Sequence, residues 1–186
     1  SSAASDVYKR QGGVGLIACQ WAKAIGAHLI GTVSSAAKAE LAKAHGAWAT
    51  VDYSHENVVE RVLALTDGKK CPVVYDSVGK DTWLTSLDCT AQRGLVVSFG
   101  NASGPVDGVN LGILSQKGSL YVTRPTLFGY ASTPERLQAM ADDLFGMITS
   151  GKVKVEINQR FALADAAKAQ TELAARRTTG STILLP

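Results

Sequence analysis

The stretch that most constrains this chain is Gln11-Gly12-Gly13-Val14-Gly15, which leads directly into a segment with apolar residues at helical spacing. Glycine lets the backbone approach a ligand closely, because it has no side chain to interfere. The first turn of the following helix would present unpaired N–H groups and the positive end of the helix dipole. A glycine turn that opens a helix is therefore typical of a phosphate-binding loop.

These glycines match the dinucleotide-binding motif Gly-x-Gly-x-x-Gly only in part. Gly12 and Gly15 keep the final x-x-Gly spacing, whereas the position of the first glycine is Arg10. An ordinary glycine turn before a helix is the alternative interpretation. The motif therefore needs support from the rest of the chain.

Residues 1–11 do not resemble the buried strand that should lead into such a turn. Strands inside a parallel sheet are near-continuous apolar runs, whereas this segment offers only Val7 and Tyr8. Residues 6–11 also resemble a translated sequencing adapter. We therefore expect residues 1–11 to be a non-native or disordered segment, the first strand to be missing or replaced, and the native protein to begin upstream of Gly12. Loss of a central strand would make the chain fold poorly.

From Gly12 onwards, segments typical of helices and of strands alternate. Short apolar strands are expected at residues 28–33, 49–51, 72–76, 94–100 and 119–123, with helical segments between them. This alternation is typical of right-handed β-α-β units. It predicts an α/β fold, a doubly wound parallel (Rossmann) sheet with helices on both faces. Residues 12–133 form the expected dinucleotide-binding domain.

The alternation changes after Pro134. The sequence predicts a long helix to about residue 149, an extended run at 153–157, a helix over 163–175 and a terminal strand at 182–185. No repeat or low-complexity linker separates these segments from the rest.

Composition places the chain among ordinary globular proteins. Of its 186 residues, 46% are hydrophobic and 19% are charged, and the formal net charge of +3 is too small to indicate nucleic acid binding. No apolar run approaches the roughly 20 residues of a membrane span. We therefore expect neither a nucleic acid partner nor a membrane, and a cytoplasmic location.

Three cysteines, Cys19, Cys71 and Cys89, lie far apart in the sequence. Their odd number and the lack of a Cys-x-x-Cys pair argue against a disulfide framework. No histidine stands at metal-ligand spacing from them, so the sequence supports no zinc site. The pattern favours buried thiols in a reducing compartment.

The segment Thr32-Val33-Ser34-Ser35-Ala36-Ala37-Lys38 follows the second expected strand and contains no acid. NAD-binding members of this fold place Asp or Glu there to bind the ribose 2′-hydroxyl. A carboxylate would repel a 2′-phosphate, whereas hydroxyls and the Lys38 ammonium would bind it. We expect NADPH for this reason; the alternative is that Lys38 is merely a solvated helix residue. The missing acid also argues against a methyltransferase, and no Tyr-x-x-x-Lys pair indicates a short-chain dehydrogenase.

Four separated segments resemble one family. They are residues 12–23, Val74-Tyr75-Asp76-Ser77-Val78-Gly79, Ser98-Phe99-Gly100-Asn101 and Gly118-Ser119-Leu120-Tyr121-Val122-Thr123-Arg124-Pro125. In this order they resemble NADPH:quinone oxidoreductase, the zinc-free, zeta-crystallin-like branch of the medium-chain dehydrogenase/reductase superfamily. The similarity covers residues 12–186 and implies the C-terminal nucleotide-binding portion of such a protein.

The resemblance implies which residues bind NADPH. The implied pyrophosphate contacts are Gly12, Gly13, Val14 and Gly15. The implied contacts of the adenosine 2′-phosphate are Ser34, Lys38 and Tyr53, with Arg176 as a further phosphate contact. The implied lining of the cleft, ending at the nicotinamide and its wall, is Ser77, Val78, Phe99, Gly100, Asn101, Thr123 and Arg124. Alternatively, Val78 and Phe99 are core residues and Arg176 is a surface charge.

The family also implies partners. Its strand at residues 119–123 lies at the sheet edge and pairs with a second subunit, which predicts a homodimer and protects an apolar edge. Its substrate site lies against a preceding catalytic domain that is absent from this chain. Residues 134–186 are then the last helix of the nucleotide-binding domain and tail segments that normally pack on that catalytic domain, partly through the segments after Asn158.

The implied activity is that of an oxidoreductase which passes reducing equivalents from NADPH to a quinone, independently of zinc. Asp76 is the acid expected at a strand end facing the cleft, and we favour a helix-capping role for it over a role as general acid. We name no catalytic side chain, and expect this fragment to be weakly active or inactive. The alternatives are an NADPH-dependent alkenal or enoyl reductase of the same superfamily and a non-catalytic dinucleotide-binding module.

Overall fold

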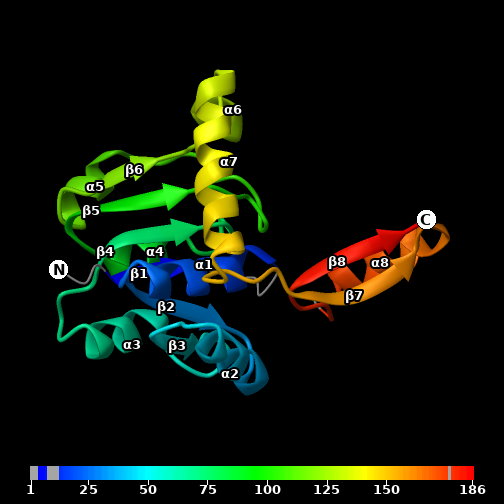
Figure 1. The fold of residues 1–186 in the computed structure, drawn as a ribbon. Helices are drawn as coiled ribbons and strands as arrows, with labels where there is room; N and C mark the ends of the chain where they lie inside the picture. Colours follow the sequence, from blue (N-terminus) through cyan, green and yellow to red (C-terminus); the bar gives the residue numbers. More distant parts are fainter. Residues whose placement is uncertain (1–3, 8–12, 176) are drawn as a thin grey trace.

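The computed structural model describes residues 4–7, 13–175 and 177–186, and it contains a six-stranded sheet flanked by helices (Figure 1). The strands of that sheet are β1 (Ala4–Val7), β2 (His28–Val33), β3 (Ala49–Asp52), β4 (Cys71–Asp76), β5 (Thr90–Ser98) and β6 (Tyr121–Thr123). Their order is β3-β2-β1-β4-β5-β6, and every neighbouring pair is parallel. This confirms the predicted doubly wound Rossmann sheet.

Strand β1 occupies the centre of the sheet. Its backbone runs in register with both neighbours, so that Asp6 lies between Ile30 of β2 and Val74 of β4. The sequence predicted a first strand that is missing or replaced, and the structure has a strand of unusual composition in its place. The expectation that the sheet lacks a central member is therefore wrong. Four residues of the segment 1–11 form regular structure, because backbone pairing with β2 and β4 requires no particular side chain.

Helices cover both faces of this sheet, as the alternation of segments predicted. The helices that follow β1 to β4 are α1 (Gly13–Ala24), α2 (Ala36–Ala44), α3 (Val58–Leu65) and α4 (Trp83–Cys89). One apolar cluster joins α1 and α2 to Leu29 of β2. Another joins α3 and the end of α4 to Ile30, the next residue of the same strand. Successive residues of a strand point to opposite faces, so these clusters are the two cores of the layered fold.

Polar residues determine where several helices begin. The Ser35 hydroxyl accepts a hydrogen bond from the Lys38 N–H at the start of α2, and the Asn57 side chain accepts from two N–H groups of α3. Helix α7 (Pro134–Thr149) combines a Thr133 cap with proline in its first turn. These are the usual signals of a helix N-terminus. The helix predicted after Pro134 is therefore confirmed.

The C-terminal part of the chain forms a second, smaller unit. It contains β7 (Ile157–Ala162), the 3₁₀ turn η1 (Leu163–Asp165), α8 (Ala166–Ala174) and β8 (Ser181–Leu185), with β7 and β8 in a parallel pair. Figure 1 shows this unit apart from the six-stranded sheet, on the side toward which the strand arrows point. The extended run predicted at 153–157 is misplaced, since β7 begins only at Ile157.

Helix α7 has a largely uncovered apolar face. It follows the two short helices α5 (Gly112–Gln116) and α6 (Leu127–Tyr130), and none of its residues is fully buried. Its exposed apolar side chains are Leu137, Met140, Leu144 and Phe145. The positions 137, 140 and 144 follow helical spacing, which indicates a face suited to pack against other protein.

Candidate nucleotide-binding site

The candidate site lies along the carboxyl ends of the parallel strands. The strand order reverses between β1 and β4, and in doubly wound sheets ligands bind at this switch point. Helix α1 begins at Gly13, close after β1, so its N-terminus is directed to the same edge. Gly12 and Arg176, which the sequence assigned to the phosphates, lie outside the described residues.

The end of β2 brings together the three residues predicted to contact the 2′-phosphate. The Lys38 ammonium lies 3.3 Å from the Ser34 hydroxyl, so both groups face the same space. The Tyr53 N–H donates to the Val33 carbonyl at 3.0 Å, which places the Tyr53 backbone beside the start of that loop. The Tyr53 side chain packs against the apolar cluster of Ile30 and Val58. Nearby Asp52 accepts hydrogen bonds from Ser54, and the Ser54 hydroxyl lowers the pKa of the Asp52 carboxyl.

The end of β4 carries Asp76, which is almost fully buried at 1% exposure. One carboxylate oxygen accepts from the N–H groups of Val78 and Gly79 at 2.8 and 3.0 Å. The other accepts from the Ser86 hydroxyl at 2.7 Å. A carboxylate bound in this way holds the turn after β4 and cannot also face a substrate. The cap residue of α4 is Thr82, and Asp76 binds none of the first N–H groups of that helix, so the expected helix-capping role is wrong and Asp76 holds the turn instead. Its bonded carboxylate argues against use as a general acid.

The loops that follow β4 and β5 pass very close to each other. A side-chain carbon added at Gly100 would lie 2.2 Å from the Ser77 carbonyl oxygen, which is too close for any residue other than glycine. The Phe99 N–H donates to the Asp76 carbonyl at 2.8 Å. Phe99 itself is 38% exposed, so its ring is available at the edge of the sheet. Val78, by contrast, packs in the core, and only its backbone could contact a ligand.

Arg124 directly follows β6 (Tyr121–Thr123), the strand at one end of the sheet. Its guanidinium donates to the Ser98 carbonyl at 2.7 Å. In the amide orientation that satisfies its neighbours, Asn101 donates to the Gly100 carbonyl at 2.8 Å and accepts from Arg124 at 3.3 Å. Arg124 therefore fixes the loop after β5 from the side of β6 and adds positive charge there.

The described residues of the prediction thus follow one edge of the sheet, from Tyr53 at one end to Arg124 at the other. Three residues that the sequence did not identify support this edge: Thr82 and Ser86 bind Asp76, and Ser103 binds the Val78 carbonyl. Only the spacing of Asp76 and Thr82, an acid and a hydroxyl flanking a glycine turn, could have suggested the first of them. The others depend on contacts between elements.

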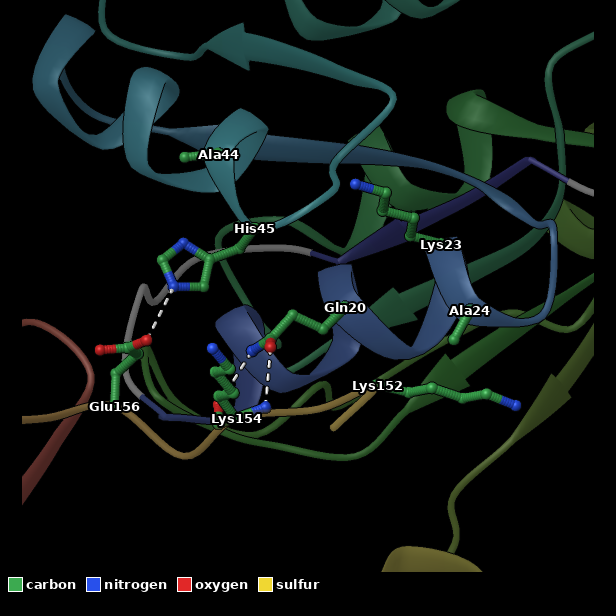
Figure 2. Close-up of a pocket in the computed structure, with 8 residues that line it drawn as sticks. All are labelled: Gln20, Lys23, Ala24, Ala44, His45, Lys152, Lys154 and Glu156. Carbon is green, nitrogen blue, oxygen red and sulfur yellow. Dashed lines mark hydrogen bonds and ion pairs between the residues drawn. The ribbon is translucent and has the colours of Figure 1, made fainter. Parts of the chain in front are cut away.

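A separate hollow of ≈ 470 Å³ lies at the C-terminal ends of α1 and α2 (Figure 2). It is lined by Gln20, Lys23, Ala24, Ala44, His45, Lys152, Lys154 and Glu156. Figure 2 shows Lys23 and Lys152 pointing in different directions, so their ammonium groups do not converge on one ligand. The predicted nucleotide contacts lie at the N-terminal ends of the same helices.

Two further observations concern metal ligands and membrane spans in the described part of the chain. No group of three or more His, Cys, Asp or Glu within residues 4–7, 13–175 and 177–186 is arranged to hold a metal ion. Of the helices that the structure describes, none has both the length and the apolar character that a bilayer span requires.

Comparison with known proteins identifies the family. A family model described as zinc-binding dehydrogenase matches residues 13–145. Quinone oxidoreductase of Pseudomonas aeruginosa is 80% identical over 175 residues, which are 94% of this chain and 54% of that protein. The chain therefore spans about half the length of the curated relatives it matches.

Solved structures give the same result. A quinone oxidoreductase of Pseudomonas syringae pv. tomato is 69% identical with a TM-score of 0.95, and the match covers 100% of this chain and 57% of the other. The Escherichia coli quinone oxidoreductase crystallised with NADPH is 55% identical, with the same TM-score and the same coverage. This chain belongs to the zinc-binding dehydrogenase family, and within it the chain is similar to the quinone oxidoreductases.

Proposed function

We propose that the chain is the NADPH-binding part of a quinone reductase. The observation that carries this proposal is the Ser34–Lys38 pair at the end of β2, where an NAD-specific protein would place an acid. Its 55% identity to a quinone oxidoreductase crystallised with NADPH supports the same conclusion. When bound, the cofactor supplies reducing equivalents that pass from the nicotinamide to the quinone.

The role of the protein is to bind and orient the cofactor. Gly13, Val14 and Gly15 at the N-terminus of α1 would contact the pyrophosphate, and Ser34, Lys38 and Tyr53 the 2′-phosphate. The nicotinamide end would lie over the loops after β4 and β5, against Ser77, Phe99, Gly100 and Asn101. Thr123 and Arg124 would form the adjoining wall.

The chemistry needs no acid from these loops. A quinone accepts reducing equivalents readily, and Asp76, the buried acid of this edge, is saturated by hydrogen bonds from the protein. The family description names zinc, but the described residues provide no fitting ligand set. We therefore propose a zinc-independent reaction and derive no step through a metal ion.

Residues 134–186 contain surface that fits a larger protein. The apolar face of α7 and the exposed Leu163, Leu173 and Leu184 of the C-terminal unit suit packing against further protein. We propose that residues 134–149 complete the nucleotide-binding domain 12–133 and that the tail contributes to a catalytic domain. Quinone reduction by the present chain should then be weak, even where NADPH binds.

Two finer proposals accompany this function. Strand β6 lies at the edge of the sheet with Tyr121 and Val122 exposed, which favours a homodimer through this edge. A cytoplasmic location is favoured by the unpatterned cysteines Cys19, Cys71 and Cys89, all of which are buried.

A fluorescence titration with NADPH and NADH tests the function. We expect the chain to bind NADPH more tightly, and Lys38→Glu to abolish this preference through repulsion of the 2′-phosphate. Lys43→Glu is the matched control, because it makes the same charge change in the last turn of the same helix. Equal affinity for both nucleotides, or loss of the preference in the control as well, would contradict the proposed site.

An acceptor screen on a full-length relative carrying the same site distinguishes the alternatives. Faster reduction of alkenals or enoyl compounds than of quinones would indicate the neighbouring reductase activity. Nucleotide binding without reduction of any acceptor would indicate a non-catalytic module.

A further inference from the structure

Asp76 is a buried acid that touches no open surface, yet it connects the loops on which the nicotinamide would lie. We propose that Asp76, held by Thr82 and Ser86 of helix α4 and its cap, is a positioning residue for the nicotinamide half of the site. The proposal rests on the proposed function, because it concerns how that site holds NADPH.

Four groups donate hydrogen bonds to the Asp76 carboxylate. Besides the Val78 and Gly79 N–H groups, the Thr82 hydroxyl lies 2.9 and 3.0 Å from its two oxygens, and the Ser86 hydroxyl lies 2.7 Å from one. Thr82 is 7% exposed and Ser86 is fully buried. All of these groups donate, which suits a carboxylate, and no described residue forms an ion pair with it. Directional hydrogen bonds therefore fix the position of the carboxylate.

Asp76 also fixes the turn after β4. Its side chain binds the N–H groups of the second and third residues that follow, Val78 and Gly79. Gly79 has a φ of +89°, and a side chain there would meet the Gly104 carbonyl at 2.5 Å. The Asp76 carboxylate therefore binds the turn on its buried side, and the Gly104 carbonyl packs against it on the other side.

The turn after β4 packs directly against the loop after β5. The Ser77 carbonyl occupies the space that a side chain of Gly100 would need, and the Ser103 N–H and hydroxyl both bind the Val78 carbonyl at 2.9 Å. Because the two loops are packed this closely, neither can move without displacing the other. A shift of the turn after β4 therefore moves Phe99, Gly100 and Asn101, the residues proposed to contact the nicotinamide.

The effect of Asp76 on the site should be local. Ser34, Lys38 and Tyr53 follow β2 and β3, which are separated from β4 by the central strand β1. None of the hydrogen bonds of Asp76 reaches those loops. Weakening the carboxylate network should therefore affect the nicotinamide half and leave the adenosine half unchanged.

The test compares two probes on the same variants of the full chain. NADPH contacts both halves of the site, whereas adenosine 2′,5′-bisphosphate lacks the nicotinamide and reports on the adenosine half alone. Ser86→Ala and Thr82→Val each remove one hydroxyl from the carboxylate. Thr90→Val is the matched control, because the Thr90 hydroxyl is equally buried and binds the Ser86 carbonyl at 2.7 Å without touching Asp76.

We expect Ser86→Ala and Thr82→Val to weaken NADPH binding by roughly fivefold to tenfold, the equivalent of one buried hydrogen bond. The affinity for adenosine 2′,5′-bisphosphate should stay within about twofold of the original chain, and Thr90→Val should leave both affinities unchanged. The emission of bound NADPH should also shift toward that of free NADPH in the first two variants only, because it reports the surroundings of the nicotinamide.

Urea unfolding is measured for each variant first, so that every titration is carried out under conditions in which that variant is folded. Equal weakening of both probes, or a loss in Thr90→Val as large as in Ser86→Ala, would show a merely structural role and overturn the inference. Unchanged NADPH affinity and emission in both hydroxyl variants would overturn it as well. If the original chain binds neither probe, the proposed function fails, and the inference fails with it.

Discussion

Gln20 and Lys154 exchange two hydrogen bonds although 134 positions separate them in the sequence. The Gln20 amide donates to the Lys154 carbonyl at 3.0 Å and accepts from the Lys154 N–H at 2.8 Å (Figure 2). A side chain that pairs with a backbone in this way takes the place of a neighbouring strand. It fixes the segment before β7 on helix α1, next to the fully buried Val153.

The same segment has a second attachment. His45 at the end of α2 lies 3.7 Å from Glu156, and the Glu156 carbonyl accepts from the Ser181 N–H at the start of β8. The C-terminal unit is therefore attached to α1 and α2 through residues 154 and 156. Since the unit lies on the side of the carboxyl ends of the strands, these attachments determine where it stands relative to the candidate site (Figure 1).

Replacing Gln20 by leucine should release this segment. Leucine has a similar volume but can make neither hydrogen bond, so the Lys154 N–H loses its partner. We expect amide hydrogen exchange at Lys154 to become at least about tenfold faster, which corresponds to roughly 1.4 kcal/mol of local opening. Gln138→Leu is the control, because it removes an exposed glutamine contact within α7. Equal protection of Lys154 in both variants would show that Val153 alone holds the segment.

Gly100→Ala should damage the candidate site. The new methyl group would lie 2.2 Å from the Ser77 carbonyl oxygen. Because the nearest atoms are backbone atoms and not a flexible side chain, either the loop after β4 or the loop after β5 must move. We expect a loss of several kcal/mol in the free energy of unfolding, or weaker NADPH binding where the chain tolerates the change. Gly146→Ala in helix α7 meets no atom within 4 Å and should instead stabilise the protein by about 0.5–1 kcal/mol. Urea unfolding of both variants is the measurement, and a stable Gly100→Ala with unchanged affinity would contradict the close contact.

Cys19 should make stability fall at high pH. It is 4% exposed among the small apolar residues between α1, α2 and β2, and burial raises the pKa of its thiol from 9.0 to about 11. Above pH 9.0 the unfolded chain loses this proton while the folded chain keeps it, so the free energy of unfolding decreases as the pH rises to about 11. Two pKa units correspond to about 2.7 kcal/mol at most.

Comparison with Cys19→Ala isolates this effect from the titration of lysines and tyrosines. At pH 8 the substitution should destabilise the chain, because it leaves a small cavity. The difference between the two proteins should shrink as the pH approaches 11, since alanine has no proton to lose. A difference that is constant from pH 8 to 10.5 would show that the thiol contributes no pH dependence.

The architecture was largely predictable because it follows from periodicity. Strands such as His28–Val33 and Cys71–Asp76 are short, largely apolar runs, and Ser35, Asn57 and Thr133 signal the helix starts. Strand β1 was not predictable, because its residues lack the apolar character of a central strand and only its backbone pairing places it. The position of β7 was missed for a similar reason. The alternation in 153–157 resembles a strand, but Gln20 pairs with Lys154 in place of a neighbouring strand.

Lys38 and the missing acid after β2 could be singled out from residue type alone, and their role toward a nucleotide stays a prediction. The contacts between distant loops of the candidate site could not be predicted. The approach of Ser77 to Gly100 and the bond from Arg124 to the Ser98 carbonyl join elements that follow three different strands. For Val78 the family resemblance implied a contact in the cleft and the alternative was a core position, and its side chain does pack in the core.

Strand β6 should form the contact between two copies of the chain. It is three residues long and lies at the sheet edge, with Tyr121 59% and Val122 39% exposed. In a twofold pairing of two copies, the central Val122 would face its own copy, so Val122→Lys would place two like charges together. Sedimentation velocity should show a species of twice the mass of one chain for the original protein and a single chain for this variant. Leu185→Lys, which adds the same charge to the exposed end of β8, should leave the dimer intact. Dissociation by Leu185→Lys with a stable Val122→Lys dimer would assign the contact to the C-terminal unit instead.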